Sequence, residues 1–150
     1  MAENTIKQRI MEEMKNAMRS QQKDKLAAIR LIQAAFKQKE VDERIEISDE
    51  IALSIFDKML KQRRDSIEQY QKANRDDLVQ KEMFEVDVIK EFMPAALSHD
   101  EIVALVAKAI VETDAKTIKD MARVMGIIKP IMQGRADMTE VSNLIKSRLA

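Results

Sequence analysis

Cysteine is absent from the sequence of 150 residues, and histidine, glycine, proline and aromatic residues are scarce. Without cysteine, disulfides and thiolate metal sites are excluded, and a reducing compartment is the expected environment. Because Gly126 and Gly134 are the only glycines, a glycine-rich phosphate loop is excluded as well. Apolar runs fall short of the roughly 18 residues that span a bilayer, and the N-terminus lacks the apolar core of a signal peptide. We therefore expect a cytoplasmic protein with no membrane partner.

The sequence also has no excess of positive or negative charge. The 26 basic and 26 acidic residues give a formal net charge of zero, which argues against a strongly basic nucleic-acid binder and against DNA as a partner. The charges are nevertheless distributed unevenly. Residues 7–39 hold nine basic and three acidic residues, whereas residues 40–50 hold six acidic residues and Arg44. Such a polarised surface can steer a charged partner.

Helix-forming residues and helical spacing are abundant. Ile6, Ile10, Met14 and Met18 follow one another at four-residue intervals, which predicts a first helix over residues 4–20. Further helices are predicted around Leu26–Phe36, from an N-cap at Ser48 to about Ala73, up to Pro94, from Ser98, from Thr117 with an interruption or restart at Pro130, and from Asp137. The sequence therefore predicts an all-α, multihelical fold with two subdomains, about four helices in residues 1–94 and about three in residues 95–150.

Residues able to do chemistry do not form a recognisable set. His99, the only histidine, falls in the first turn of a predicted helix, where a surface role is expected. With one histidine and no cysteine, neither a Ser/His/Asp nor a Cys/His arrangement suggests itself. Carboxylates are plentiful, but none has the spacing of an EF-hand or of a Glu-x-x-His metal site. The sequence predicts no catalytic residue, no metal and no cofactor.

The basic residues of the second predicted helix form a regular pattern. Lys23, Arg30 and Lys37 are separated by seven residues each, so they lie in one stripe with about 10 Å between successive charges. The apolar residues are centred away from this stripe, which can therefore face solvent. A row of cations at that pitch could follow a polynucleotide backbone. An ordinary solvated helix face explains the same periodicity equally well.

The stretch "KMLKQRRDSIEQYQKANRDD", residues 58–77, divides on a helical wheel. Its basic residues fall on the outer side, with one exception. Arg63 falls inside the apolar arc, which predicts a buried ion pair, with a pocket or phosphate contact as the alternative. Tyr70 also lies on the apolar arc, where a core position is favoured over a base-stacking platform. The outer cations are Lys58, Lys61, Arg64, Lys72 and Arg75.

Four segments together resemble the GatB/YqeY family. They are "KDKLAAIRLIQAAFKQKEVD", "KQRRDSIEQYQKANRDDLVQKE", "EVDVIKEFMP" and "KDMARVMGIIKPIMQGRAD", and they occur in this order. The resemblance covers residues 11–149 and implies a multihelical fold in two subdomains. It also implies a relation to the tail of the B subunit of glutamine-dependent aminoacyl-tRNA amidotransferase, a carbon–nitrogen ligase, whose tail contacts tRNA without performing the chemistry.

The resemblance leads to the expectation of a tRNA-binding accessory module without catalysis of its own. Two alternatives stay open, namely a protein-interaction module associated with translation enzymes and without RNA contact, and a catalytic amidotransferase component. The expected RNA contacts are cations in three groups, namely Lys23, Arg30 and Lys37, then Lys61, Arg64 and Arg75, then Lys119, Arg123, Lys129 and Arg135. We expect Lys129 and Arg135 to flank helix breaks, where backbone N–H groups could also meet phosphate.

Overall fold

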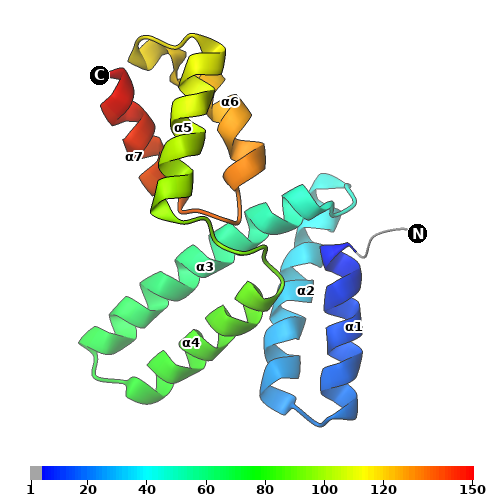
Figure 1. Cartoon of the computed structure of the whole chain (residues 1–150). Helices are drawn as coiled ribbons and strands as arrows, with labels where there is room; N and C mark the ends of the chain where they lie inside the picture. The colour runs from blue at the N-terminus through cyan, green and yellow to red at the C-terminus, as the bar shows by residue number, and fades with distance from the viewer. Residues whose placement is uncertain (1–4) are drawn as a thin grey trace. The chain divides into compact units, whose positions relative to one another are not determined.

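The described residues of the chain form helices that are joined by short turns and loops. The computed structural model describes residues 5–150, in which there are seven α-helices, one 3-10 helix and no strand (Figure 1). The elements are α1 (Ile6–Arg19), α2 (Lys23–Glu43), α3 (Asp49–Lys72), α4 (Asp76–Glu91), α5 (His99–Thr113), the 3-10 helix η1 (Ile118–Asp120), α6 (Met121–Met132) and α7 (Met138–Leu149). The predicted all-α fold is therefore confirmed. Residue 4, the predicted start of the first helix, lies outside the described residues.

Side-chain caps define where several helices begin. Ser48, Ser98 and Asp137 cap α3, α5 and α7 as predicted, each with a side-chain oxygen that accepts a backbone N–H of the first turn. The sequence prediction missed Thr5, which forms a capping box with Gln8 at the start of α1. These caps satisfy N–H groups that have no partner inside the helix.

The sixth predicted helix continues through Pro130, where the sequence predicted an interruption or restart. Pro130 lies inside α6, which continues to Met132. A proline lacks the N–H that would bond to the carbonyl four residues earlier, here that of Gly126, and its ring crowds that carbonyl. Gly126 is exposed, and a Cβ there would meet no atom within 4 Å, so water can reach this part of the helix. The prediction that a helix break flanks Lys129 is therefore wrong, because the break comes only after Met132.

The chain divides into two compact units, one ending at Met93 and one running from Pro94 to Ala150. In the first, called unit 1, α1 and α2 form one antiparallel hairpin, and α3 and α4 form another (Figure 1). Its core combines aliphatic residues with three aromatic rings, of which Phe36 and Phe56 lie 5.6 Å apart between centroids. Phe92, at the end of α4, is the third. Unit 1 therefore holds its two hairpins together with a continuous apolar core.

The second unit, called unit 2, packs α5, α6 and α7 around an aliphatic core. Val106, Val124 and Ile145 are fully buried at its centre, one from each helix. None of the helices in residues 5–150 has the length and apolar character that a bilayer-spanning helix requires.

Candidate binding surface

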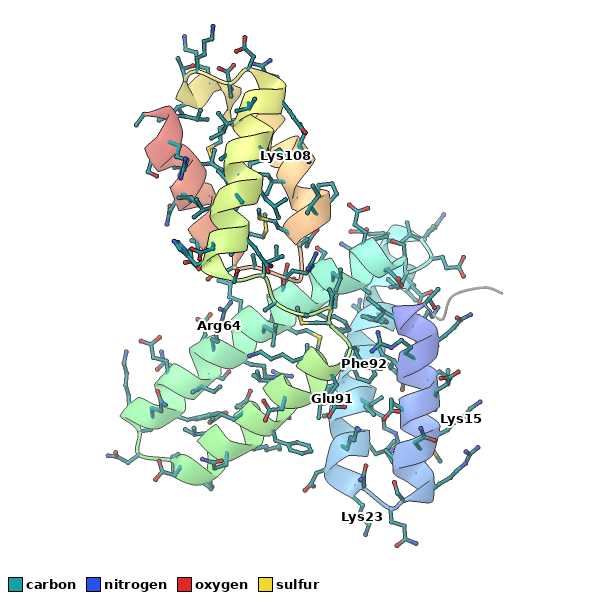
Figure 2. The ribbon with its side chains drawn as sticks, in the orientation of Figure 1. Lys15, Lys23, Arg64, Glu91, Phe92 and Lys108 are labelled. Carbon is teal, nitrogen blue, oxygen red and sulfur yellow. The ribbon has the colours of Figure 1, made fainter. Side chains whose placement is uncertain are left out.

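The predicted cation stripe of α2 faces solvent. Lys23, Arg30 and Lys37 are all exposed, because the buried residues Ala28 and Ile32 mark a core side of the helix that is turned away from them. Among residues 5–150, no ion pair or hydrogen bond engages the side chains of these three cations. Figure 2 shows Lys23 extending away from the tip of the α1–α2 hairpin. The stripe is therefore a row of charges free to meet a partner.

A row of methionines lies on α1 beside this stripe. Met11 and Met18 have exposed fractions of 45% and 52%, and Met14 between them is partly buried against the core. On a helical wheel the three fall within an arc of about 60°. We call Met11, Met14 and Met18 together with Lys23, Arg30 and Lys37 the methionine–cation face.

Two ion pairs between α1 and α2 identify the side of the hairpin to which this face belongs. Lys7 contacts Glu40 at 2.9 Å, and Lys25 contacts Glu13 at 3.2 Å. Lys25 also contacts Glu91 of α4 at 3.1 Å, so the wheel positions near Lys25 and Glu13 face α4. The methionine and cation rows lie on the opposite sides of α1 and α2. They therefore share the hairpin face that points away from α4.

Negative charge is nearly absent from the methionine–cation face. The residues between the two rows include Leu26 and Gln33, and Lys15, on the outer flank of the methionine row, points outward in Figure 2. Glu40 lies at the margin and is paired with Lys7. Exposed thioethers beside unpaired cations form a surface with both apolar and electropositive character. Methionine is common on adaptable binding surfaces because its side chain is flexible and polarizable.

The second predicted cation group is less uniform. Lys61 and Arg64 are exposed on α3, and Figure 2 shows Arg64 on that helix. Arg75 is exposed too, but its guanidinium binds the Asp77 carboxylate through two hydrogen bonds of 3.0 and 3.1 Å. The Asp77 carboxylate keeps the pKa of Arg75 above its usual value, and Arg75 lowers that of Asp77. A partner contacting Arg75 would have to compete with this local pair.

Arg63 is the exception that the wheel predicted. Its Nε lies 2.8 Å from a Glu85 carboxylate oxygen and 3.5 Å from a Glu82 oxygen, so it joins α3 to α4. Only 19% of the Arg63 side chain and 11% of the Glu85 side chain are exposed. Burial raises the pKa of Glu85, and the nearby Arg63 charge opposes that rise. The predicted buried ion pair is confirmed.

The four predicted contact cations of unit 2 fall into two pairs. Lys119 and Lys129 are exposed, without an ion-pair partner among residues 5–150. Arg123 instead binds the Asp120 carboxylate, and Arg135 donates a hydrogen bond to the Ala95 carbonyl at 3.1 Å. The Leu97 N–H donates to the Arg135 carbonyl at 2.8 Å, so Arg135 ties residues 95–97 to the turn before α7. Arg123 and Arg135 therefore have structural contacts that sequence spacing alone did not reveal.

Asp120 is the centre of a local hydrogen-bond cluster at the start of α6. Its carboxylate accepts the backbone N–H groups of Lys116 and Thr117 and also binds Arg123. The Lys116 N–H, the Arg123 guanidinium and the Thr117 N–H together lower the pKa of Asp120 to about 2. Bonds of this kind stabilise the charged carboxylate, so Asp120 serves as a structural anion.

No chemical centre emerges from the described residues. In residues 5–150 there is no group of three or more histidine, cysteine, aspartate or glutamate side chains placed to hold a metal. A groove of about 60 Å³ between α5 and α6 is lined mainly by Leu105, Ile127, Ile131 and other apolar residues. The polar side chains lining it are Lys108 and Glu112, which lie 3.9 Å apart. Such a lining can receive an apolar side chain but supplies no acid–base pair.

The family model described as "Yqey-like protein" matches residues 7–149. This chain therefore belongs to the Yqey-like family, and the resemblance inferred from its four segments is confirmed.

Several curated relatives carry the name "Altered inheritance of mitochondria protein 41, mitochondrial". The one from Pyrenophora tritici-repentis is 33% identical over 147 residues, covering 96% of this chain and 81% of the relative. Those from Eremothecium gossypii and Lachancea thermotolerans are 40% and 36% identical, covering 57% and 69% of this chain. The matches span 48% and 57% of those two relatives, so this chain corresponds to about half of each.

These names correct two expectations. The predicted function as a tRNA-binding accessory module related to an amidotransferase tail is contradicted, because the relatives are named for the inheritance of mitochondria. The predicted cytoplasmic location is contradicted because the same names describe the relatives as mitochondrial. The basic residues themselves stay predicted binding residues, because the names do not bear on which side chains contact a partner.

Proposed function

We propose that this Yqey-like chain is a docking module whose working surface is the methionine–cation face of unit 1 and whose partner is an acidic protein segment. The observation that carries the proposal is the adjacency of two rows, exposed methionines on α1 and unpaired cations on α2. The cations attract carboxylates over several ångströms, and the methionines supply apolar contact area once the partner arrives.

A partner with both acidic and apolar side chains uses this surface more fully than a simple polyanion does. Met11 and Met18 would stay in water if only the cations were contacted, although their exposed fractions are 45% and 52%. Burying apolar area stabilises a complex by about 25 cal/mol per Å², whereas exposed ion pairs contribute little each. The proposal therefore assigns affinity mainly to the methionines, and orientation and association rate to the cations.

The test is a titration of the full chain, labelled at its methionine methyl groups, with a helical peptide rich in glutamate and leucine. The expected result is that the methyl signals of Met11 and Met18 shift. Met83 on α4 is the matched control, because its exposed fraction of 46% is similar but it lies away from the face. Shifts of Met83 equal to those of Met11 and Met18 would overturn the proposal, as would no shift at all.

A second arm uses charge reversal. Arg30→Glu should weaken peptide binding, because it places a like charge opposite the carboxylates of the peptide. Lys81→Glu on α4 is the control, since Lys81 is also exposed and lies on another helix. Arg30→Glu should melt at the temperature of the parent protein, because no ion pair or hydrogen bond engages the Arg30 side chain in residues 5–150. Equal loss of binding in the two variants would point to net charge rather than to this face.

A further inference from the structure

We infer that the acidic segment binds as an α-helix whose carboxylates recur every seven residues, in register with Lys23, Arg30 and Lys37. This inference rests on the proposed function, because it specifies the structure of the segment that the docking surface receives. It is based on the spacing of the two rows and on the way in which α1 and α2 are aligned.

The cation row repeats at the pitch of a packed helix. Lys23, Arg30 and Lys37 are seven residues apart, so successive charges lie about 10 Å apart along α2. A second helix lying alongside α2 rises by the same amount per residue. Its side chains seven residues apart therefore recur at the same pitch and remain on one face. An extended segment advances about 3.3 Å per residue and would match the cations only every third residue, where its side chains alternate between faces.

The methionine row has the same repeat and is aligned with the cations. Met11 and Met18 are also seven residues apart, on a helix that runs antiparallel to α2. The hairpin turns at residues 20–22, so residues equally distant from the turn are level with one another. Along the axis of the hairpin, Met18 is thus at nearly the same position as Lys23, and Met11 at nearly the same position as Arg30. The surface offers one thioether and one cation at each of two successive levels.

A partner helix lying between the rows can meet both at once. Its leucines, three or four residues apart, would pack on Met11, Met14 and Met18, while carboxylates on its flank approach the cations. The same face fits an anionic lipid surface less well. Membrane-seated amphipathic helices often bury phenylalanine or tryptophan, whereas the aromatic residue of α1 and α2, Phe36, is buried in the core.

The experiment compares two peptides of about 20 residues with the same composition and the same helicity. In the matched peptide, three glutamates lie seven residues apart beside a leucine stripe; in the shifted peptide, they are moved to the opposite face. The matched peptide should bind the full chain about tenfold more tightly, measured by calorimetry, because only its carboxylates reach all three cations.

A charge exchange sharpens the comparison. Arg30→Glu should weaken the binding of the matched peptide. Replacing the central glutamate of that peptide by lysine should restore the affinity of the variant for it. Restoration requires that these two positions lie opposite each other, so a general charge effect would not produce it. The lysine peptide should bind the parent protein more weakly than the matched peptide does.

The outcomes separate the inference from the proposed function. Equal affinity for the two peptides, with Met11 and Met18 methyl signals still shifting, would overturn the register and leave the docking surface intact. Shifts produced by anionic phospholipid vesicles, but by neither peptide, would overturn both and identify a lipid surface as the partner.

Discussion

Unit 1 has ion pairs that join different helices, in addition to local pairs such as Arg75–Asp77. Lys25 of α2 contacts Glu13 of α1 and Glu91 of α4, and Arg63 of α3 contacts α4. In unit 2, the ion pairs Lys108–Glu112, Lys116–Asp114 and Arg123–Asp120 join near neighbours. The distant connection there is made by a cation and a backbone carbonyl, Arg135 with Ala95. These ion pairs therefore join different helices in unit 1 but residues at most four positions apart in unit 2.

This difference also decides which predicted cations remain open to a partner. On α2, Lys23, Arg30 and Lys37 lie on the outer side of a long helix, beyond the reach of the acids on neighbouring helices. In unit 2, Arg123 and Arg135 lie beside connecting segments whose carboxylate and carbonyl oxygens need donors. A basic residue near a chain turn is therefore a weaker candidate for binding than one on an outer helical stripe.

The largest effect should come from removing the charge bridge between α3 and α4. Arg63→Ala leaves Glu82 and Glu85 buried without their cation, which should lower the free energy of unfolding by about 3 kcal/mol. The control is Lys61→Ala on the same helix, an exposed residue whose loss should change stability by at most about 0.5 kcal/mol. Chemical denaturation of the full chain measures both. Equal stability of the two variants would contradict the role of charge between helices in unit 1.

The next effect should be confined to unit 2. Arg135→Ala removes the hydrogen bond to the Ala95 carbonyl and should reduce stability by about 1.5 kcal/mol, since charged donors form stronger hydrogen bonds than neutral ones. Hydrogen exchange should show faster opening in α6 and α7, with α1 to α4 unchanged. Lys129→Ala, an exposed cation in the same unit, is the control and should leave exchange as it was.

A smaller and salt-dependent effect is expected at the junction of α1, α2 and α4. Lys25→Gln removes contacts of 3.2 Å to Glu13 and 3.1 Å to Glu91, and should cost about 1 kcal/mol at low salt. The difference from the parent protein should shrink at about 1 M salt, because partly exposed charges are screened. A difference that stays constant with salt would mean that Lys25 acts through packing of its aliphatic stem.

The smallest expected effect is on the stability of the α6 start at low pH. The pKa of Asp120 in the folded protein is about 2, below its ordinary 3.8, so its contribution to stability is present above about pH 4 and is lost as pH falls from about 4 to 2. Asp120→Asn should flatten this part of the pH profile, measured as amide exchange at the start of α6. The control, Asp100→Asn, changes an exposed aspartate in α5 and should keep the profile of the parent protein.

A four-residue spacing predicts a helix correctly, but over several turns it does not predict which of its residues are buried. The spacing of Ile6, Ile10, Met14 and Met18 predicted the first helix, yet Met18 is 52% exposed. Each step of four residues advances about 40° around a helix, so three steps turn Met18 about 120° away from Ile6. Ala17 occupies the core position instead. The same rotation brings Met18 beside the cation stripe, which is why the methionine–cation face was not predicted.

The sequence by itself determined the features that depend on residues within one or two turns. These include the all-α fold, the caps at Ser48, Ser98 and Asp137, and the inward direction of Arg63. Caps, turn conformations and helix faces follow from local geometry, which spacing along the chain records.

Tertiary structure alone decided which charges have partners. The helical wheel places Lys37 in the cation stripe and Lys25 outside it, but only packing brings Glu13 and Glu91 to Lys25 and leaves Lys37 without an ion pair in residues 5–150. An ion pair between helices requires two side chains to meet within about 4 Å, and that distance depends on how whole helices pack rather than on their separation in the sequence.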